Sequence, residues 1–200
     1  MTTTTKSLGA ALGTLFILGA TSATGFAATA HMPMGGNTSQ PIGHAYFCQQ
    51  LPQECAVRTR SAKPMRLTKK RWRELTEINA YANAAVSPVT DQDFYGVEEH
   101  WTYPKSYGDC EDYVLLKRYM LMQKGWPAHT LLITVVKQAN GEGHAVLTVR
   151  TDRGDFALDN LRGKVSLWSK TPYQYLKRQS RFHSGRWTTI KDRRAQVAGY

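Results

Sequence analysis

The spacing of apolar residues predicts two amphipathic helices in the first two thirds of the chain. From Thr68 to Val86, apolar positions recur every three or four residues, and Pro88 ends the pattern. A second segment, from Glu111 to Lys124, has the same period, with acids at its start and a Gly-Trp-Pro sequence after its end. The apolar positions are Trp72, Leu75, Ile78, Ala82 and Ala85 in the first segment, and Val114, Leu115, Tyr119, Leu121 and Met122 in the second.

After the second helix the pattern changes to alternation and short apolar runs, which are typical of strands. Turn sequences at 140–141 and 152–154 separate these runs, so the pattern predicts an antiparallel meander. Helices followed by an antiparallel sheet indicate the α+β fold class. The expected strands are Thr130–Lys137, His144–Arg150, Asp155–Leu158 and a short one at Val165–Trp168, and a helical turn is expected at Tyr173–Arg178.

Two other segments have no regular period. Residues 31–41 are rich in Gly, Pro, Asn and Ser and contain few groups to bury, which indicates a flexible leader. Residues 87–107 contain two prolines, a glycine and several aromatic residues, which favours an ordered loop whose own rings pack together. The domain proper is therefore expected to cover residues 42–200.

The first 30 residues have the features of a secretory signal peptide. Lys6 is their only charged residue, and the apolar stretch from Leu8 to Ala20 is too short to span a bilayer comfortably as a helix. Small residues at Ala28 and Ala30 fit a cleavage site before His31, and Ala27-Ala28 is the alternative site. The alternative is an uncleaved membrane anchor at the N-terminus. Cleavage would leave no stable membrane span, because no other segment is apolar enough.

The chain is basic, with a formal net charge of +11 at pH 7. Its lysines and arginines are scattered among acidic and apolar positions, and this arrangement does not favour a nucleic-acid partner. For an exported protein, the charge fits an anionic environment or an acidic substrate, or simply the solvated faces of helices.

Three cysteines divide into a pair and a single residue. Cys48 and Cys55 are separated by six residues, and in an oxidising compartment they can close a short disulfide loop. The alternative is two free or metal-binding thiols, but no second Cys or His pair with zinc-finger spacing accompanies them. Cys110 is then the thiol that remains for chemistry.

Cys110 lies at the start of the second predicted helix, where free backbone N–H groups and the helix dipole favour a thiolate. The neighbouring Asp109, Glu111 and Asp112 oppose this effect, because negative charges raise the pKa of a thiol. A nucleophilic Cys110 therefore needs a positive charge nearby. On position alone, a cysteine here is more often a small buried apolar residue.

His144 and Asp159 are the candidates for a base and for the group that orients it. His144 follows Gly141-Glu142-Gly143 at the start of a predicted strand. If residues 152–153 form a two-residue hairpin loop, Asp159 lies opposite Val146, diagonal to His144 on the same face of the sheet. The alternative roles are a turn residue for His144 and a strand end for Asp159.

Three short sequences give a specific resemblance. Gly108-Asp-Cys-Glu-Asp-Tyr113, Gly143-His-Ala-Val-Leu147 and Leu158-Asp-Asn-Leu161 resemble motifs of the bacterial transglutaminase-like cysteine proteinases. The resemblance extends from about Phe47 to Trp187. It implies a papain-like or transglutaminase-like core of helices packed on an antiparallel sheet, in a periplasmic protein.

The resemblance also implies a role for each candidate residue. Cys110 would be the nucleophile, His144 the general base and acid, and Asp159 the orienting carboxylate of a cysteine endopeptidase. A transamidase would use the same thioester, and a binding protein without catalytic activity could keep the fold. No organic cofactor is expected.

Calcium and two protein partners complete these expectations. Relatives include a calcium-dependent periplasmic protease that releases biofilm cells by cutting surface adhesins, under the control of an inner-membrane receptor. The acids that match its calcium ligands are Asp109, Glu111 and Asp112, and oxygen ligands suit a hard cation. The alternative is that Glu111 and Asp112 only stabilise the helix N-terminus.

Overall fold

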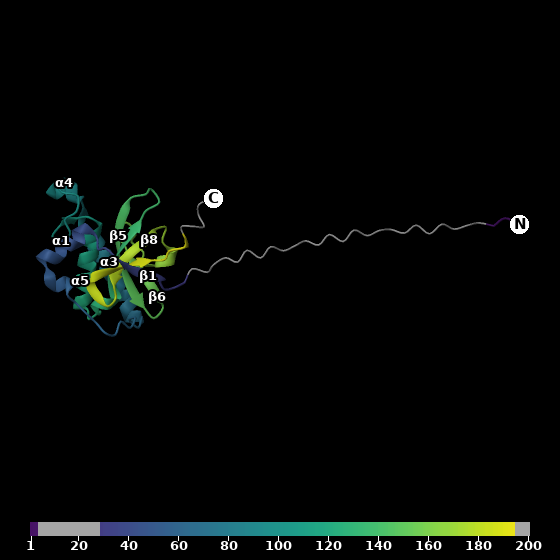
Figure 1. Ribbon diagram of the computed structural model, residues 1–200, viewed down its shortest axis with the longest axis horizontal. Helices are drawn as coiled ribbons and strands as arrows, with labels where there is room; N and C mark the ends of the chain where they lie inside the picture. The colour runs from purple at the N-terminus through teal and green to yellow at the C-terminus, as the bar shows by residue number, and fades with distance from the viewer. Residues whose placement is uncertain (4–28, 195–200) are drawn as a thin grey trace.

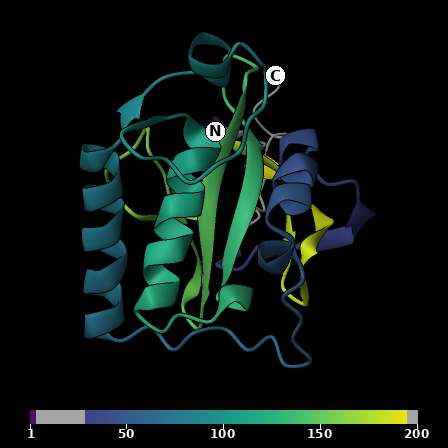
Figure 2. The same cartoon turned by 90° about the vertical axis from the view of Figure 1, so that its left-hand side faces the viewer.

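The computed structural model describes residues 1–3 and 29–194. From Met34 onward the chain forms helices packed against a seven-stranded antiparallel sheet. The strand order is β1-β9-β8-β4-β5-β6-β7. Helices α3 and α5 lie side by side on one face of the sheet, and α1 and α2 lie beside β9 (Figures 1 and 2). This arrangement confirms the α+β class expected from the sequence.

The helices are α1 (Ile42–Gln50), α2 (Pro52–Cys55), α3 (Lys69–Ala85), α4 (Asp91–Tyr95) and α5 (Cys110–Gln123), with short 3₁₀ turns at Ala128–Thr130 and Trp168–Lys170. The strands of the main sheet are β1 (Met34–Thr38), β4 (Leu131–Lys137), β5 (Gly143–Thr151), β6 (Gly154–Leu158), β7 (Ser166–Leu167), β8 (Gln174–Ser180) and β9 (His183–Ile190). Two further strands, β2 (Ser87–Pro88) and β3 (Tyr107–Gly108), pair in parallel away from that sheet.

Both predicted helices are confirmed within one residue at each end. Thr68 is the N-cap of α3, and its hydroxyl accepts the backbone N–H of Arg71 at 3.2 Å. The apolar stripe of α3 is buried at Leu75, Ile78 and Ala82, as its period indicates. The stripe packs against α5, and α5 in turn packs against β5 in the main core.

The two faces of the sheet bury different sets of residues. Along β5, Ala145, Leu147 and Val149 face the helices in the main core, whereas Val146 belongs to a second cluster on the other face. Neighbouring residues point to opposite faces because the side-chain period of a strand is two. The second cluster contains Met32, Val136, Val146, Ala157, Trp168, Tyr173, Tyr175 and Ile190.

Two expectations about secondary structure, at residues 31–41 and 173–178, are wrong. The segment at 31–41 was expected to be a flexible leader, but Met34–Thr38 forms β1 and pairs with β9. Its composition is poor for a strand, and it is held by that pairing and by Met32, which is buried in the second cluster. The helical turn expected at 173–178 is strand β8, which pairs with both β4 and β9.

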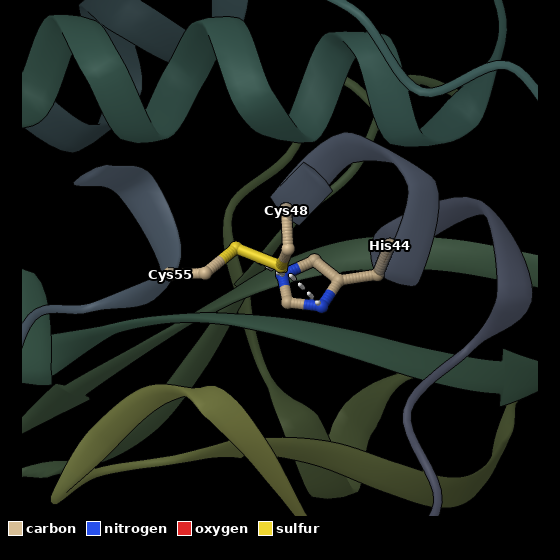
Figure 3. A group of neighbouring side chains, drawn as sticks. All are labelled: His44, Cys48 and Cys55. Atoms are coloured by element: carbon tan, nitrogen blue, oxygen red, sulfur yellow. Dashed lines mark hydrogen bonds between the residues drawn. A yellow bond between two sulfur atoms is a disulfide. The ribbon is translucent and has the colours of Figure 1, made fainter. Parts of the chain in front are cut away.

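The predicted disulfide between Cys48 and Cys55 is present, with Cα atoms 5.5 Å apart (Figure 3). It joins α1 to α2, and the imidazole of His44 lies against its sulfur atoms. Trp187 Nε1 lies 3.2 Å from Nδ1 of that ring. Burial, followed by the nearby charge of Arg118, lowers the pKa of His44 to about 4, so the ring is neutral at physiological pH.

The expected signal peptide falls mostly outside the described residues, since residues 4–28 are not among them. Within the described part of the chain, every helix is too short or too polar to cross a membrane.

Lys117 is a buried charge in the core, and replacing it with methionine is expected to stabilise the protein. Its side chain is 0% exposed, and its Nζ has no hydrogen-bond partner among the described residues. Burial lowers the pKa of Lys117 to about 7, although the charge of Asp159 opposes this shift. Lys117→Met should therefore raise the free energy of unfolding by about 2 to 4 kcal/mol at pH 7.

The gain should shrink as the pH rises from 7 to 10. In that window the unfolded state keeps its proton on Lys117 while the folded state loses it, so wild-type stability rises with pH and the methionine variant lacks this rise. Urea unfolding at both pH values measures the difference, with the exposed Lys124→Met on the same helix region as the control. A less stable Lys117→Met at pH 7 would contradict the prediction.

Candidate active site

Cys110 is the first residue of α5 and the free cysteine of the described chain. Its Sγ lies 3.3 Å from the backbone N of Ala145, which donates to it, and 3.3 Å from Oε2 of Glu111. The side chain is half-buried, and as the first helical residue its own backbone N–H has no partner within the helix. The Cys110 thiol therefore contacts the backbone at the start of β5.

His144 and Asp159 are hydrogen-bonded to each other. His144 Nε2 lies 2.9 Å from Asp159 Oδ1, and both side chains are buried. Thr151 pairs with Gly154, so residues 152–153 form the two-residue hairpin loop on which the expected register depended. The hairpin places Asp159, the residue after β6, beside His144, the second residue of β5.

Tyr173 holds the other oxygen of this carboxylate. Its Oη donates to Asp159 Oδ2 at 2.5 Å, and its ring lies 5.4 Å from that of His144, centroid to centroid. Burial alone would raise the pKa of Asp159, but the hydrogen bonds from His144 and Tyr173 bring it below its ordinary value. Burial and the bond to Asp159 raise the pKa of Tyr173 to about 12. The carboxylate is thus kept ionised with its orientation fixed.

The three sequence-predicted residues converge from separate elements. Ala145, whose N–H reaches the thiol, directly follows His144 on β5. In the described chain the hydrogen bond of the imidazole goes to Asp159, so its second nitrogen remains available. A cysteine at a helix start, an imidazole and a buried carboxylate in this arrangement can carry out acyl transfer.

The charge around Cys110 opposes a thiolate. Burial raises the pKa of this thiol well above its ordinary value, and Glu111 and Asp109 raise it further. The N–H from Ala145 acts in the opposite direction but is outweighed. The neutral thiol therefore needs both a base and a neighbouring positive charge if it is to act as a nucleophile.

Three carboxylates gather beside the thiol. One oxygen each of Asp91, Asp109 and Glu111 can be chosen so that all three lie within 4.8 Å of one another. Asp91 is buried, accepts the backbone N–H of His100 and donates its own N–H to Asp109 Oδ2 at 3.4 Å. Burial, followed by the Asp109 carboxylate, raises the pKa of Glu111 to about 10. No cationic side chain pairs with these three acids among the described residues.

This group fits a hard cation. Asp109 Oδ1 is enclosed and has no hydrogen-bond partner in the described chain, and every side-chain donor in the group is a carboxylate oxygen. Asp112, expected as a ligand, is not a member of the group. The Oδ1 atom of Asp112 accepts the backbone N–H of Thr102 at 2.9 Å, and its Oδ2 atom has no hydrogen-bond partner among the described residues. Burial raises the pKa of Asp112 to about 8, with smaller contributions from the charges of Asp109 and Asp91.

Asp91 and Tyr173 are site residues that the sequence pattern alone does not indicate. Asp91 opens a five-residue helix inside the segment expected to be a loop, where an acid is typical of a helix start. Tyr173 directly precedes strand β8, in the segment where the sequence pattern predicts a helical turn. Trp101 lies nine residues before Cys110 and is close enough in sequence to be a candidate for the second oxyanion donor. Its side chain is buried, however, and its indole N–H donates to Glu99 Oε2 at 2.8 Å, which favours a packing role.

Comparisons with solved structures support the fold. The chain resembles Legionella pneumophila LapG at 23% identity with a TM-score of 0.50, covering 62% of this chain and 71% of LapG. It resembles calcium-bound LapG at 23% identity with a TM-score of 0.48, covering 54% of this chain and 64% of that chain. The chain therefore spans less than two thirds of the calcium-bound relative. A search of curated proteins found no match.

The family comparison covers most of the described chain. Residues 34–195 match the profile of the bacterial transglutaminase-like cysteine proteinases, abbreviated BTLCP. The match begins at β1 and includes Cys110, His144 and Asp159 together with the carboxylates beside the thiol. This chain belongs to the family of bacterial transglutaminase-like cysteine proteinases.

Proposed function

We propose that this protein is a periplasmic cysteine endopeptidase, with Cys110 as nucleophile, His144 as general base and acid, and Asp159 as the carboxylate that orients it. The observation that carries the proposal is the hydrogen bond of 2.9 Å between His144 on β5 and Asp159 after β6. The residue that follows His144, Ala145, donates its backbone N–H to the Cys110 thiol. Family membership supports the same assignment.

The reaction follows from the acid and base properties of these groups. His144 takes the thiol proton through the nitrogen that does not face Asp159, and the sulfur attacks the carbonyl carbon of a peptide bond. The backbone N–H of Cys110 is the first donor for the oxyanion. His144 then protonates the leaving amine, and water hydrolyses the thioester. Asp159 stabilises the imidazolium while it exists, and Tyr173 keeps the carboxylate in place.

A calcium ion would be held by Asp91, Asp109 and Glu111. It would supply a positive charge beside Cys110 and offset the carboxylates that oppose the thiolate. Asp112 stays a predicted ligand, because its unpartnered Oδ2 belongs to the same acidic neighbourhood.

The location and partners of the protein remain part of the proposal. The N-terminal 30 residues support export, with a signal peptide removed near His31. The family resemblance supports a surface adhesin as protein substrate and an inner-membrane receptor as regulator. A protein partner of either kind would meet the mature domain in the periplasm.

Mapping of peptide termini tests the activity. Wild type and Cys110→Ala, each as the mature chain with calcium, are incubated with a library of unfolded peptides, with and without an added primary amine. New amino termini matched by free carboxyl termini, which only the wild type produces, would support hydrolysis. New carboxyl termini that carry the added amine in place of a free carboxylate would replace endopeptidase by transamidase, and neither product would contradict both.

A further inference from the structure

A pocket lined by several charged side chains lies on the face of the sheet opposite the helices. It has a volume of about 560 Å³ and is lined by the N-terminal segment at His31 and Met32, by residues 62–64, and by side chains of β5, β6, β8 and the turn that follows. Arg150 of this pocket is six residues after His144 on β5, about 20 Å along the strand. The pocket is therefore separate from the thiol site.

Positive charge dominates this pocket. Lys63, Arg150, Arg178 and Arg181 supply four cations, and Asp155 is the one acid among the lining residues. With His31 neutral, these side chains have a net charge of +3. The cations repel one another: burial, then the charge of Arg178, lowers the pKa of Arg150 to about 10. Asp155 balances only one of the four cations, so the pocket keeps an excess of positive charge.

Two of these arginines are buried and fixed in place. Arg150 is 6% exposed and Arg178 is 3% exposed. Arg178 Nη1 donates to Asp155 Oδ2 at 2.8 Å, and Arg150 Nη1 donates to the carbonyl oxygen of Ala62 at 3.0 Å. Arg150 and Asp155 are also direct partners across β5 and β6. Strand pairing and these bonds hold the guanidinium groups without help from a ligand.

Each of the two guanidinium groups keeps unused donors. Nε and Nη2 of Arg150 and of Arg178 make no hydrogen bond to the described residues. Guanidinium groups bind phosphate and carboxylate through paired N–H donors. A buried cation with free donors is costly unless an anion or water satisfies it.

We propose that this pocket binds a phosphate group, carried either by a soluble molecule or by a lipid headgroup. A dianion matches the excess charge of +3 better than a single carboxylate does. The rim offers apolar surface for the rest of such a molecule, because Phe182 is 48% exposed and the Arg181 guanidinium stacks on it at 4.9 Å. The site does not depend on the proposed peptidase activity.

Binding of pyrophosphate and of vesicles tests the proposal and distinguishes the two sources. Titration calorimetry uses the folded mature chain and pyrophosphate at fixed ionic strength, because exposed charges are screened by salt. Cosedimentation uses phosphatidylglycerol vesicles, with phosphatidylcholine vesicles as the uncharged comparison. Pyrophosphate binding supports a soluble ligand, binding only to phosphatidylglycerol supports a headgroup, and binding to neither overturns the proposal.

Matched variants separate the pocket from general charge. Arg181→Gln removes an exposed rim arginine, and Arg186→Gln removes the same charge from an exposed position outside the pocket. We expect Arg181→Gln to weaken binding about tenfold and Arg186→Gln less than twofold. Arg150→Gln should abolish binding, provided that its melting curve shows a folded protein. If Arg150→Gln unfolds, Lys63→Gln is used in its place and should weaken binding about fivefold. Equal losses for Arg181→Gln and Arg186→Gln would overturn the proposal.

Discussion

Replacing His144 with alanine is expected to slow acylation of Cys110 by about three orders of magnitude. Burial and the Glu111 and Asp109 carboxylates keep the pKa of the thiol well above its ordinary value, so very little thiolate exists at pH 7 without a base. His144 is the base that directly precedes Ala145, whose backbone N–H donates to the sulfur of Cys110. The measurement is the rate of covalent labelling by a thiol-directed inhibitor of cysteine proteases, followed by intact mass.

The design of this experiment separates the base from its support. His129→Ala, at a partly exposed histidine of a 3₁₀ turn, is the control and should label at the wild-type rate. Asp159→Asn should slow labelling less than His144→Ala, because asparagine can still accept a hydrogen bond from the ring. Labelling of His144→Ala at the wild-type rate would remove His144 from the mechanism, and labelling of Cys48 or Cys55 would contradict the assignment of Cys110.

The parts of this site that follow from local pattern could be predicted from the sequence. The start of α5 is indicated by its apolar period and its acids, which places Cys110 at the helix N-terminus. The relation between His144 and Asp159 follows from a two-residue hairpin, since its register fixes which residues face each other. Both inferences need only contacts between neighbouring elements.

The parts that depend on distant partners could not be predicted. Strand β8 lacks alternation because Arg178 and Gln179 are both buried polar residues. Arg178 is held by Asp155, and Gln179 donates to the carbonyl oxygen of Ser184 at 2.9 Å. A local window contains polar residues but not the partners that allow their burial, so the period-two signal is lost.

Asp91 was missed for a similar reason. The parallel pairing of Pro88 with Gly108 brings the start of α4 beside the start of α5, although 18 residues separate Asp91 from Asp109. Two strands of two residues leave almost no periodic signal. Asp91 therefore joins the carboxylate group only through tertiary structure, whereas Asp109 and Glu111 could be found from the sequence motif around Cys110.

Calcium is expected to raise the melting temperature of the protein by about 5 to 10 °C at a concentration 100 times the Kd. Asp91, Asp109 and Glu111 converge without a cationic partner in the described chain, so a bound divalent ion would remove their mutual repulsion in the folded state alone. Asp91→Asn removes one charged ligand and should weaken calcium binding at least tenfold. Differential scanning fluorimetry across a calcium titration measures both effects.

Asp93→Asn is the matched control, because it removes the same charge from the same short helix at an exposed position. This variant should keep the wild-type calcium response. An equal loss of response in Asp91→Asn and Asp93→Asn would indicate general surface charge, and no response in the wild type would remove calcium from the proposal. Asp112→Asn tests whether Asp112 is also a calcium ligand. A weakened calcium response in this variant would add Asp112 to the group formed by Asp91, Asp109 and Glu111. An unchanged calcium response would leave the Asp112 carboxylate as a partner of the Thr102 backbone.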